Sequence, residues 1–200
     1  MVAIITGDII NSTETTPNVW LNALKQVLNQ FGKEPRQWDI YRGDSFQLEV
    51  HPNEALKAAI LIKTSLKQFK HIDARLAIGI GEKSYDSDKI TESNGSAFVN
   101  SGQCFDQLKK TTLAIQSPIA EFDSQINLML ELALLVMDYW KPTTSTILKY
   151  TLEHPNQNQE VIAKQLQKSQ SNISEGLKRG GYDELLKLLS YYESQIQTVC

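Results

Sequence analysis

Cysteine is almost absent from this 200-residue sequence, which contains only Cys104 and Cys200. Two cysteines cannot build the framework of several disulfides that holds small secreted domains together, nor a zinc site with several cysteine ligands. The three histidines, at positions 51, 71 and 154, are far apart and follow no metal-ligand spacing. The sequence therefore argues against a disulfide scaffold and against a cysteine-ligated zinc protein.

The sequence also lacks an excess of basic residues and a long hydrophobic run. It has 20 Lys and Arg against 23 Asp and Glu, a formal net charge of −3, so no overall electrostatic attraction to nucleic acid is expected. The longest apolar run, residues 126–137, is too short to span a membrane and contains Glu131. Because the N-terminus has no basic region and reaches Asp8 early, it does not resemble a signal peptide. We expect a soluble, cytoplasmic protein with no membrane partner.

Strand and helix patterns alternate over the first part of the chain. β-Branched or alternating runs predict strands, and apolar residues at helical spacing predict helices. This order, with a hairpin in its middle, is typical of an α+β fold. The predicted strands cover residues 2–10, two stretches within 37–50, 73–81 and 113–116, and the predicted helices cover 19–31, 53–69 and 97–110.

The pattern becomes entirely helical after a polar segment, residues 117–124, which is the best candidate for a linker. We therefore divide the chain into an α+β domain, residues 1–117, and a helical domain, residues 118–200. Residues 111–140 contain no Lys or Arg, so the first helix of this half is expected to dock in the interior or on a partner chain. The predicted helices of this half cover residues 125–140, 143–152, 159–166, 170–179 and 182–198.

Two aspartates stand in strand patterns of the first half. Asp8 lies in the first apolar strand, and Asp44 lies between the two strands of the hairpin. A carboxylate in such a place is costly to bury without a partner, and two of them together repel unless a cation lies between them. Because Mg²⁺ is held by one or two carboxylates plus phosphates, the pair predicts a metal-nucleotide site. The structural alternative is that Asp8 caps the following helix, that Asp44 is a turn residue, and that Arg42 pairs with one of them.

Short motifs around these aspartates resemble those of class III nucleotidyl cyclases. Residues 6–13, Thr-Gly-Asp-Ile-Ile-Asn-Ser-Thr, are similar to the first metal motif, and residues 42–46, Arg-Gly-Asp-Ser-Phe, are similar to the second, which lies in a hairpin. Residues 73–81 resemble the strand that follows. The resemblance implies a ferredoxin-like, cyclase-like antiparallel sheet, and a nucleotide pocket built across the interface of a homodimer.

The whole chain resembles the SatD family of small bacterial proteins more closely. The shared features are the start Ile-Ile-Thr-Gly-Asp-Ile-Ile-Asn-Ser, the segment Tyr-Arg-Gly-Asp-Ser-Phe-Gln and the strand Ala-Ile-Gly-Ile-Gly. Residues 92–98, the pair Ser101-Gly102 and a helix-turn-helix near the end are also shared. The resemblance covers essentially the full length of the chain.

The resemblance to cyclases implies a role for each residue of the predicted pocket. It makes Asp8, the backbone carbonyl of Ile9 and Asp44 the ligands of Mg²⁺ or Mn²⁺. It places Arg42 and Gly43 beside the phosphates of a nucleoside triphosphate or related nucleotide, where a guanidinium can make bidentate contacts. Further nucleotide contacts are implied for Glu92, Asn100 and Gln103.

Three positions depart from the cyclase pattern. Ile40 stands where purine cyclases have a base-reading Lys. Val99 stands where they have the catalytic Asn, with Asn100 one residue later, and Gln103 stands where they have an Arg that stabilises phosphate. A missing positive group weakens the stabilisation of charge on the transferred phosphate. The departures are compatible with metal and phosphate binding, and they leave cyclisation open.

Residues in the last quarter match the spacing of a helix-turn-helix over about 159–179. Ala163 lies at the expected helix contact, Ser169 begins the second helix, and Ile173 and Leu177 face inward. Gln, Asn and Ser side chains read base edges, and Lys and Arg contact phosphates. The predicted DNA-contacting residues are Ser169, Gln170, Ser171, Asn172, Glu175, Lys178 and Arg179.

The charge of this region does not favour non-specific DNA binding. Residues 159–200 carry five Lys or Arg and five Asp or Glu, and phosphate neutralisation drives such binding. DNA binding is therefore expected to be sequence-specific and to need a dimer. The alternative is a helix-turn-helix used for protein contacts, and residues 182–199 are expected to serve core or dimer packing.

These features predict a cytoplasmic regulatory protein that binds a metal-nucleotide in a cyclase-like pocket and DNA through its helix-turn-helix. The main alternative is an active nucleotidyl cyclase or another enzyme of nucleotide phosphoryl transfer. A second alternative is a non-enzymatic interaction or assembly protein with a vestigial pocket.

Overall fold

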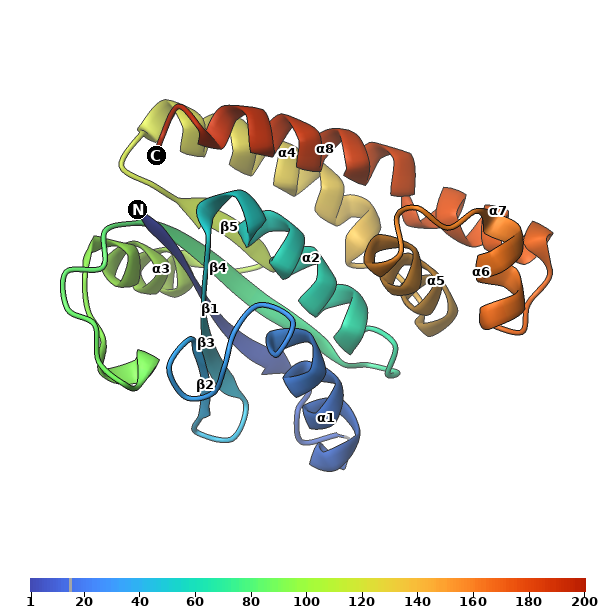
Figure 1. Ribbon diagram of the computed structural model, residues 1–200, viewed down its shortest axis with the longest axis horizontal. Helices are drawn as coiled ribbons and strands as arrows, with labels where there is room; N and C mark the ends of the chain where they lie inside the picture. Colours follow the sequence, from blue (N-terminus) through green and yellow to red (C-terminus); the bar gives the residue numbers. More distant parts are fainter. Residues whose placement is uncertain (15) are drawn as a thin grey trace.

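The N-terminal half of the computed structural model, which describes residues 1–14 and 16–200, is built on a five-stranded sheet (Figure 1). The strand order across the sheet is β2-β3-β1-β4-β5, so the two longest strands lie side by side near its middle. The expected α+β class is confirmed, and every regular element after the last strand is a helix. The strands are β1 (Val2–Ile10), β2 (Trp38–Tyr41), β3 (Ser45–Val50), β4 (Asp73–Gly81) and β5 (Leu113–Gln116).

Four of the strands form the antiparallel, ferredoxin-like arrangement. β1 pairs antiparallel with both β3 and β4, and β2 pairs antiparallel with β3. The fifth strand differs from the expected antiparallel sheet, because β5 pairs parallel with β4. Helix α3 (Ser96–Gln107) connects these two strands, and a helical crossover returns the chain in the same direction.

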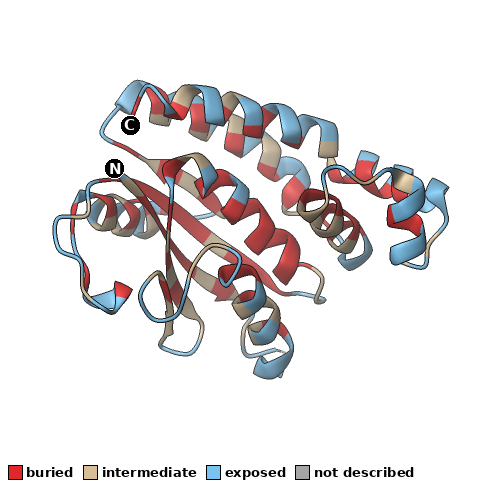
Figure 2. Ribbon diagram, viewed as in Figure 1, coloured by how far each residue is buried: buried red, intermediate tan, exposed pale blue. Residues whose placement is uncertain are grey.

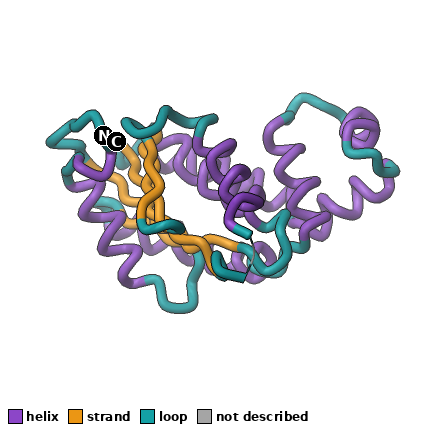
Figure 3. Tube along the Cα trace, turned by 90° about the horizontal axis from the view of Figure 1, so that it is seen from below, coloured by secondary structure: helices purple, strands orange, loops and turns teal. Residues whose placement is uncertain are grey.

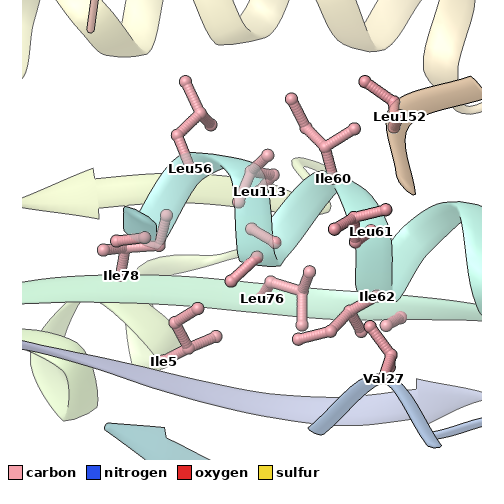
Figure 4. Close-up of a cluster of buried hydrophobic side chains, with 14 of the residues drawn as sticks. Ile5, Val27, Leu56, Ile60, Leu61, Ile62, Leu76, Ile78, Leu113 and Leu152 are labelled. Atoms are coloured by element: carbon pink, nitrogen blue, oxygen red, sulfur yellow. The ribbon is translucent and has the colours of Figure 1, made fainter. Parts of the chain in front are cut away.

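Helices cover both faces of the sheet (Figure 3). Helix α1 (Pro17–Leu28) and helix α2 (Ala55–Leu66) lie on one face, and the alternating residues Ala3 and Ile5 of β1 belong to the same hydrophobic core. Figure 4 shows α2 with apolar side chains directed toward the sheet on one side and toward the helices beyond it on the other. Ile4, which lies between these two residues in β1, instead packs in a smaller cluster with Ala97 of α3, on the opposite face.

The helical half packs on α2 and shares the main core of the sheet. Buried residues from Ala3 to Val199 form one continuous hydrophobic cluster, and the Tyr192 hydroxyl donates a 2.7 Å hydrogen bond to the Pro52 carbonyl in η1 (Pro52–Glu54). The boundary near residue 117 therefore divides the α+β part of the chain from the helical part, but the two parts share one hydrophobic core. The helices are α4 (Ala120–Met137), α5 (Pro142–Glu153), α6 (Gln159–Gln165), α7 (Gln170–Gly180) and α8 (Tyr182–Ile196).

The segment expected to be a linker is shorter than predicted, because α4 begins at Ala120. Its first turn contains Glu121 and Asp123, and acidic side chains stabilise a helix N-terminus. Asp123 also accepts a 2.9 Å hydrogen bond from the backbone N–H of Ser117, which fixes the short connection from β5. Within the described residues no helix has both the length and the apolar character needed to cross a lipid bilayer.

A buried ionic cluster joins the sheet to the helical half. The Lys63 ammonium of α2 is fully buried, and it donates to Asp73 at 2.9 Å and to the Thr112 hydroxyl at 3.0 Å. Lys67 donates to the other Asp73 oxygen at 2.8 Å and to the Asp138 carbonyl at 2.9 Å. These contacts hold the start of β4, the approach to β5 and the end of α4 together.

Candidate functional site

One row of side chains crosses the sheet on the face that α3 covers. The strand register places Tyr41 of β2 opposite Ser45 of β3, Ser45 opposite Asp8 of β1, and Asp8 opposite Arg75 of β4. Residues that are directly opposite in a sheet point to the same face. The predicted metal ligand Asp8 therefore has a tyrosine, a serine and an arginine on its own row.

The partner of Asp8 is Arg75. The guanidinium holds both carboxylate oxygens, through Nε at 3.0 Å and through a second, short contact from Nη2. Arg75 also lies over the Phe105 ring of α3, with 5.4 Å between its Cζ atom and the ring centroid. The contact with Asp8 raises the pKa of the Arg75 guanidinium. The Asp8 carboxylate, for which the sequence indicated no partner, is thus neutralised by Arg75 of the neighbouring strand β4.

Asp44 lies in the turn that connects β2 to β3, close to the end of β1. Ser12 donates a 2.8 Å hydrogen bond to the Asp44 carboxylate, and the Ile9 N–H donates to the Asp44 backbone carbonyl at 3.1 Å. The N–H and C=O groups of a residue in an antiparallel strand point to the same neighbour, so the Ile9 carbonyl also faces this turn. The backbones of Asp8, Ile9 and Asp44 therefore lie near one another at one end of the sheet.

The turn itself has an unusual backbone that exposes its two central residues. Arg42 has a φ of 55° and Gly43 a φ of 89°, and both are exposed. A left-handed conformation is strained for arginine and suits glycine. No Cβ placed on Gly43 would meet another atom within 4 Å, so the turn leaves open space above it. An exposed guanidinium is suited to contact a phosphate. A carboxylate next to it could at the same time bind the metal that the phosphate carries.

The charges of neighbouring residues shift the pKa of Tyr41, which lies in this row. Partial burial raises the pKa of its phenol, the nearby Arg42 lowers it, and the Asp8 carboxylate raises it. Tyr41 is therefore in the field of both the predicted metal ligand and the predicted phosphate-binding residue. It is a hydroxyl donor at this end of the sheet at neutral pH.

The residues present fit a metal that arrives with a nucleotide better than a resident metal ion. Two carboxylates and one carbonyl are the donors, and no group of three or more His, Cys, Asp or Glu side chains that could hold a metal occurs in the part of the chain that the structure describes. Mg²⁺ retains water and takes phosphate oxygens, so such a donor set suffices with a bound phosphate. Because Arg75 already neutralises Asp8, a metal must compete with the guanidinium for that carboxylate.

Glu92 lies near this face, beyond β2. It ends the short helix η2 (Ile90–Glu92) in the loop before α3, and it accepts a 3.4 Å hydrogen bond from Ser87. The neighbouring Thr91 donates to Asp39 of β2 at 3.4 Å. Asp39 is two residues from Tyr41, the last residue of the row. The loop that carries Glu92 therefore lies beside β2, the edge strand of the sheet.

Asn100 and Gln103 do not reach the carboxylates of their own copy. The Asn100 amide donates to the Ile80 carbonyl at 2.8 Å, and Gln103 accepts a 3.0 Å hydrogen bond from Gln116 of β5. Gln116 pairs with Gly79, which lies four residues along β4 from Arg75, a distance of about 13 Å. One copy of the chain therefore does not assemble the complete predicted nucleotide site.

The region predicted to be a helix-turn-helix consists of α6, a short turn and α7. The Asn158 side chain accepts from the Val161 N–H at 3.0 Å and caps α6, and the Ser169 hydroxyl accepts from the Asn172 N–H at 3.2 Å and caps α7. Ser169 therefore starts the second helix as predicted, and the cap satisfies one of the free N–H groups at the helix start. Figure 1 shows these helices at the end of the molecule away from α3.

The two faces of α7 differ sharply. Ile173 and Leu177 are buried as predicted, and Gly176 lets α7 approach α5, since a Cβ on it would come within 2.5 Å of Ile147. The opposite face is exposed to solvent, as Figure 2 shows for the outer side of these helices. Each predicted DNA-contacting residue is exposed, namely Ser169, Gln170, Ser171, Asn172, Glu175, Lys178 and Arg179.

The charged residues at the end of α7 have local partners. Arg179 lies 3.6 Å from Glu175, one turn earlier on the helix, and both side chains are largely exposed. Lys178 and Arg179 also line a groove between α4 and α8. The first half of α7, with Gln170 and Asn172, is therefore the part most free to enter a DNA groove.

Reasoning from the sequence missed two residues of the sheet-end site. Arg75 was placed only in a strand, although its alternation with the apolar residues around it indicates a side chain on the opposite face from α2. Ser12 lies within the motif at residues 6–13, which assigns it no role of its own. Its contact with Asp44 joins positions 32 residues apart, and no local pattern carries such a contact.

Comparison with known proteins gives no family for the chain. No protein-family model matches it, and no curated protein is significantly similar to it. The SatD and cyclase resemblances, which depend on short motifs, stay predictions.

Proposed function

We propose that the chain is a SatD-like regulatory protein of the cytoplasm that binds DNA through α7 and a metal-bound nucleotide at the end of its sheet. The observation that carries the proposal is the division of α7 into a buried apolar face and an exposed polar face. A recognition helix needs this division, because its inner side is held by the fold and its outer side is free for base edges.

The contacts of α7 support its use as a recognition helix. It packs on both α5 and α6, so it is held at a fixed angle by two helices. Gln170, Ser171 and Asn172 lie in its first turn, and the N-terminal residues of such helices contact bases in known helix-turn-helix proteins. Asn and Gln side chains can form bidentate contacts with adenine. The neutral charge of the region favours readout of sequence over non-specific attraction.

The replacement Asn172→Ala is expected to weaken specific DNA binding by about 1–3 kcal/mol, because it removes one amide from the base-contacting turn. A preferred DNA sequence is first selected from a random pool with the native protein. Fluorescence anisotropy then compares the affinities of the native and variant proteins for the selected sequence and for a scrambled one.

The matched control is Gln197→Ala, which removes an exposed amide just beyond α8. It should bind the selected sequence like the native protein. Failure of the native chain to enrich any DNA sequence would refute this half of the proposal.

The second half of the proposal concerns the end of the sheet. Asp8, the Ile9 carbonyl and Asp44 supply oxygen donors there, and the exposed Arg42 supplies a cation for phosphate. A divalent ion carried by a nucleotide would complete its shell with phosphate oxygens and water. Arg42 would orient the phosphates beside it, and the open space above Gly43 would admit them.

The replacement Asp44→Ala is expected to lower the affinity for a nucleoside triphosphate with Mg²⁺ by at least about tenfold, since it removes a carboxylate that faces the metal. Isothermal titration calorimetry measures the change with each of the four nucleoside triphosphates. The control variant Asp183→Asn alters an exposed acid at the start of α8 and should not change the affinity. Equal affinities of the native and Asp44→Ala proteins would contradict the metal-nucleotide site.

Catalysis is not part of the proposal. Gln103 stands where an arginine is expected, and with Asn100 it lies toward β5 rather than beside Asp8 in one copy. The enzyme alternative requires product formation from a nucleoside triphosphate with Mg²⁺ or Mn²⁺. The assembly alternative requires that neither DNA nor nucleotide binds.

A further inference from the structure

Helix α4 has a second apolar stripe that its own chain leaves uncovered. Leu128, Leu132 and Leu135 are 60%, 61% and 68% exposed, and Tyr139, just beyond the helix, is 81% exposed. Scattered exposed apolar residues are common, but four along one line of one helix form a contiguous patch. We call these four residues the outer stripe.

The spacing of the outer stripe is that of a helix-pairing seam. The steps from Leu128 to Leu132, Leu135 and Tyr139 are four, three and four residues, which is the heptad pattern of a coiled coil. A separate stripe on α4, with Phe122, Ile126, Leu130 and Leu134, is buried in the protein's own core. A helix that is apolar on opposite sides needs partners on both sides.

The two edges of the outer stripe carry opposite charges. On one edge, Lys178 and Arg179 line a groove of about 500 Å³ together with Val136 of α4, and Glu184 of α8 also lines it, so two basic residues stand against one acid there. On the other edge, Glu131 lines a separate hollow beside β5, together with Leu113. The α4 segment from residue 120 to 137 contains no Lys or Arg, so the positive edge comes entirely from α7.

We propose that the outer stripe is the interface of a parallel homodimer, in which two copies pair along α4 about a two-fold axis parallel to the helix. Such an axis brings each edge of the stripe against the opposite edge of the second copy. Glu131 of each copy then faces Lys178 and Arg179 of the other. The leucines and Tyr139 pack against their own counterparts as in a parallel coiled coil.

Charge decides between the two possible orientations. An antiparallel pair would bring Glu131 against the same glutamate of the second copy. It would also leave Lys178 and Arg179 with only the acids of their own copy, Glu175 and Glu184. Like charges in apposition disfavour that arrangement, whereas the parallel pair matches an acid with a base twice. This self-complementarity is the reason that the proposed occupant is a second copy of the chain.

The inference goes beyond nucleotide and DNA binding, and it does not depend on either. It places the ends of the two α7 helices at the same end of the dimer, because Arg179 adjoins the outer stripe. Dimeric helix-turn-helix proteins use two such helices on two half-sites. The interface also differs from one that would complete the nucleotide site at the sheet end.

Cysteine cross-linking tests the orientation. The variants Leu128→Cys and Tyr139→Cys are made separately in a Cys200→Ser background, because Cys200 is exposed and Cys104 is buried. In a parallel pair each new cysteine faces its counterpart within disulfide reach, so both variants should form covalent dimers on mild oxidation. An antiparallel pair cannot bring both positions together, because they are eleven residues apart. Absence of a covalent dimer at either position would overturn the parallel pair.

Sedimentation velocity tests the interface without cross-links. The native chain should be dimeric, and Leu132→Glu should be monomeric while keeping its circular dichroism spectrum, since Leu132 is on the surface of one copy. The control Val19→Glu alters an exposed apolar residue of α1 and should remain dimeric. A native chain that is monomeric over the micromolar range, or a Leu132→Glu variant as dimeric as the native protein, would overturn the proposal.

Exchange of the charges at Glu131 and Arg179 tests whether the two edges of the outer stripe face each other in the dimer. Glu131→Lys and Arg179→Glu should each weaken dimerisation, and the double variant should restore it, because the acid and base then face each other again in exchanged places. Restoration supports the parallel orientation. A double variant that dimerises no better than the weaker single variant would overturn the proposed facing of the two edges.

Discussion

Replacement of Lys63 by methionine is expected to lower the free energy of unfolding by about 3–5 kcal/mol, the cost of breaking a buried ion pair by removing one partner. The Lys63 side chain has no exposed surface, and its ammonium donates to Asp73, to the Ala74 carbonyl and to Thr112. Methionine fills a similar volume but removes the buried positive charge and its three donated hydrogen bonds, and Asp73 keeps only its contacts with Lys67 and with the Ala74 N–H. The loss should appear in urea unfolding followed by circular dichroism.

The control for this prediction is on the same helix. Lys57 of α2 is exposed, so Lys57→Met should change the free energy of unfolding by less than about 0.5 kcal/mol. Equal effects of the two replacements would show that the Lys63 cluster does not hold the sheet and the helical half together. Thr112 and Asp138 belong to the same cluster, with a 2.7 Å hydrogen bond between them. A change at Lys63 should therefore be felt at the C-terminal end of α4 and at the start of β5.

Replacement of Gly79 by alanine is expected to cost at least about 3 kcal/mol, the upper part of the range for overpacking a core. A Cβ at this position of β4 would lie 2.1 Å from the Ser101 backbone nitrogen and 2.3 Å from the Ala97 carbonyl oxygen. Neither backbone atom can move unless the whole of α3 moves away from the sheet. The free energy of unfolding and the accessibility of Cys104 to a thiol reagent measure the two consequences, since burial raises the pKa of that thiol to about 12 in the native fold.

The control is Gly102, the glycine that directly follows Ser101 on α3. A Cβ on Gly102 would meet no atom within 4 Å, and alanine is the better helix former. Gly102→Ala should therefore stabilise the protein by about 0.5–1 kcal/mol. Destabilisation by Gly102→Ala, or no effect of Gly79→Ala, would contradict the close packing of α3 on β4.

The periodicity of the sequence predicted most of the fold. The strand over residues 73–81 and the helices of the C-terminal half follow from local apolar spacing, and their observed bounds differ from the predicted ones by a few residues, most at α4. The connection before α4 was the main difference, because Asp123 serves both as a first-turn acid and as a partner of Ser117. The shared core was not visible either, since packing of α2 against α5 and α8 is a contact between distant segments.

The sequence predicted the place of the sheet-end residues but not their partners. The pattern of two strands and a hairpin was sufficient to bring Asp8 and Asp44 to one end of the sheet. The pairing of Asp8 with Arg75 depends on the register between β1 and β4, and no local pattern encodes that register. The position of Gln103 depends likewise on how α3 lies across the sheet, and its contact with Gln116 directs it toward β5.

The helix-turn-helix was predicted in more detail because its signals are local. Ser169 has a side chain that caps a helix, and the spacing of Ile173 and Leu177 defines the buried face. The residues predicted to contact DNA are exposed because they lie on the face of the helix opposite Ile173 and Leu177. The groove that Lys178 and Arg179 share with α4 required the packing of three helices, so the sequence did not indicate it.

The proposed regulatory function requires that nucleotide binding at the sheet end changes DNA binding by α7, and one titration tests this requirement. The affinity for the selected DNA is measured by fluorescence anisotropy with and without each nucleoside triphosphate and Mg²⁺. We expect at least one nucleotide to change the dissociation constant by about fivefold or more, a coupling of typical size, and Asp44→Ala to abolish the change. A dissociation constant that is the same with all four nucleotides and without them would contradict the proposal.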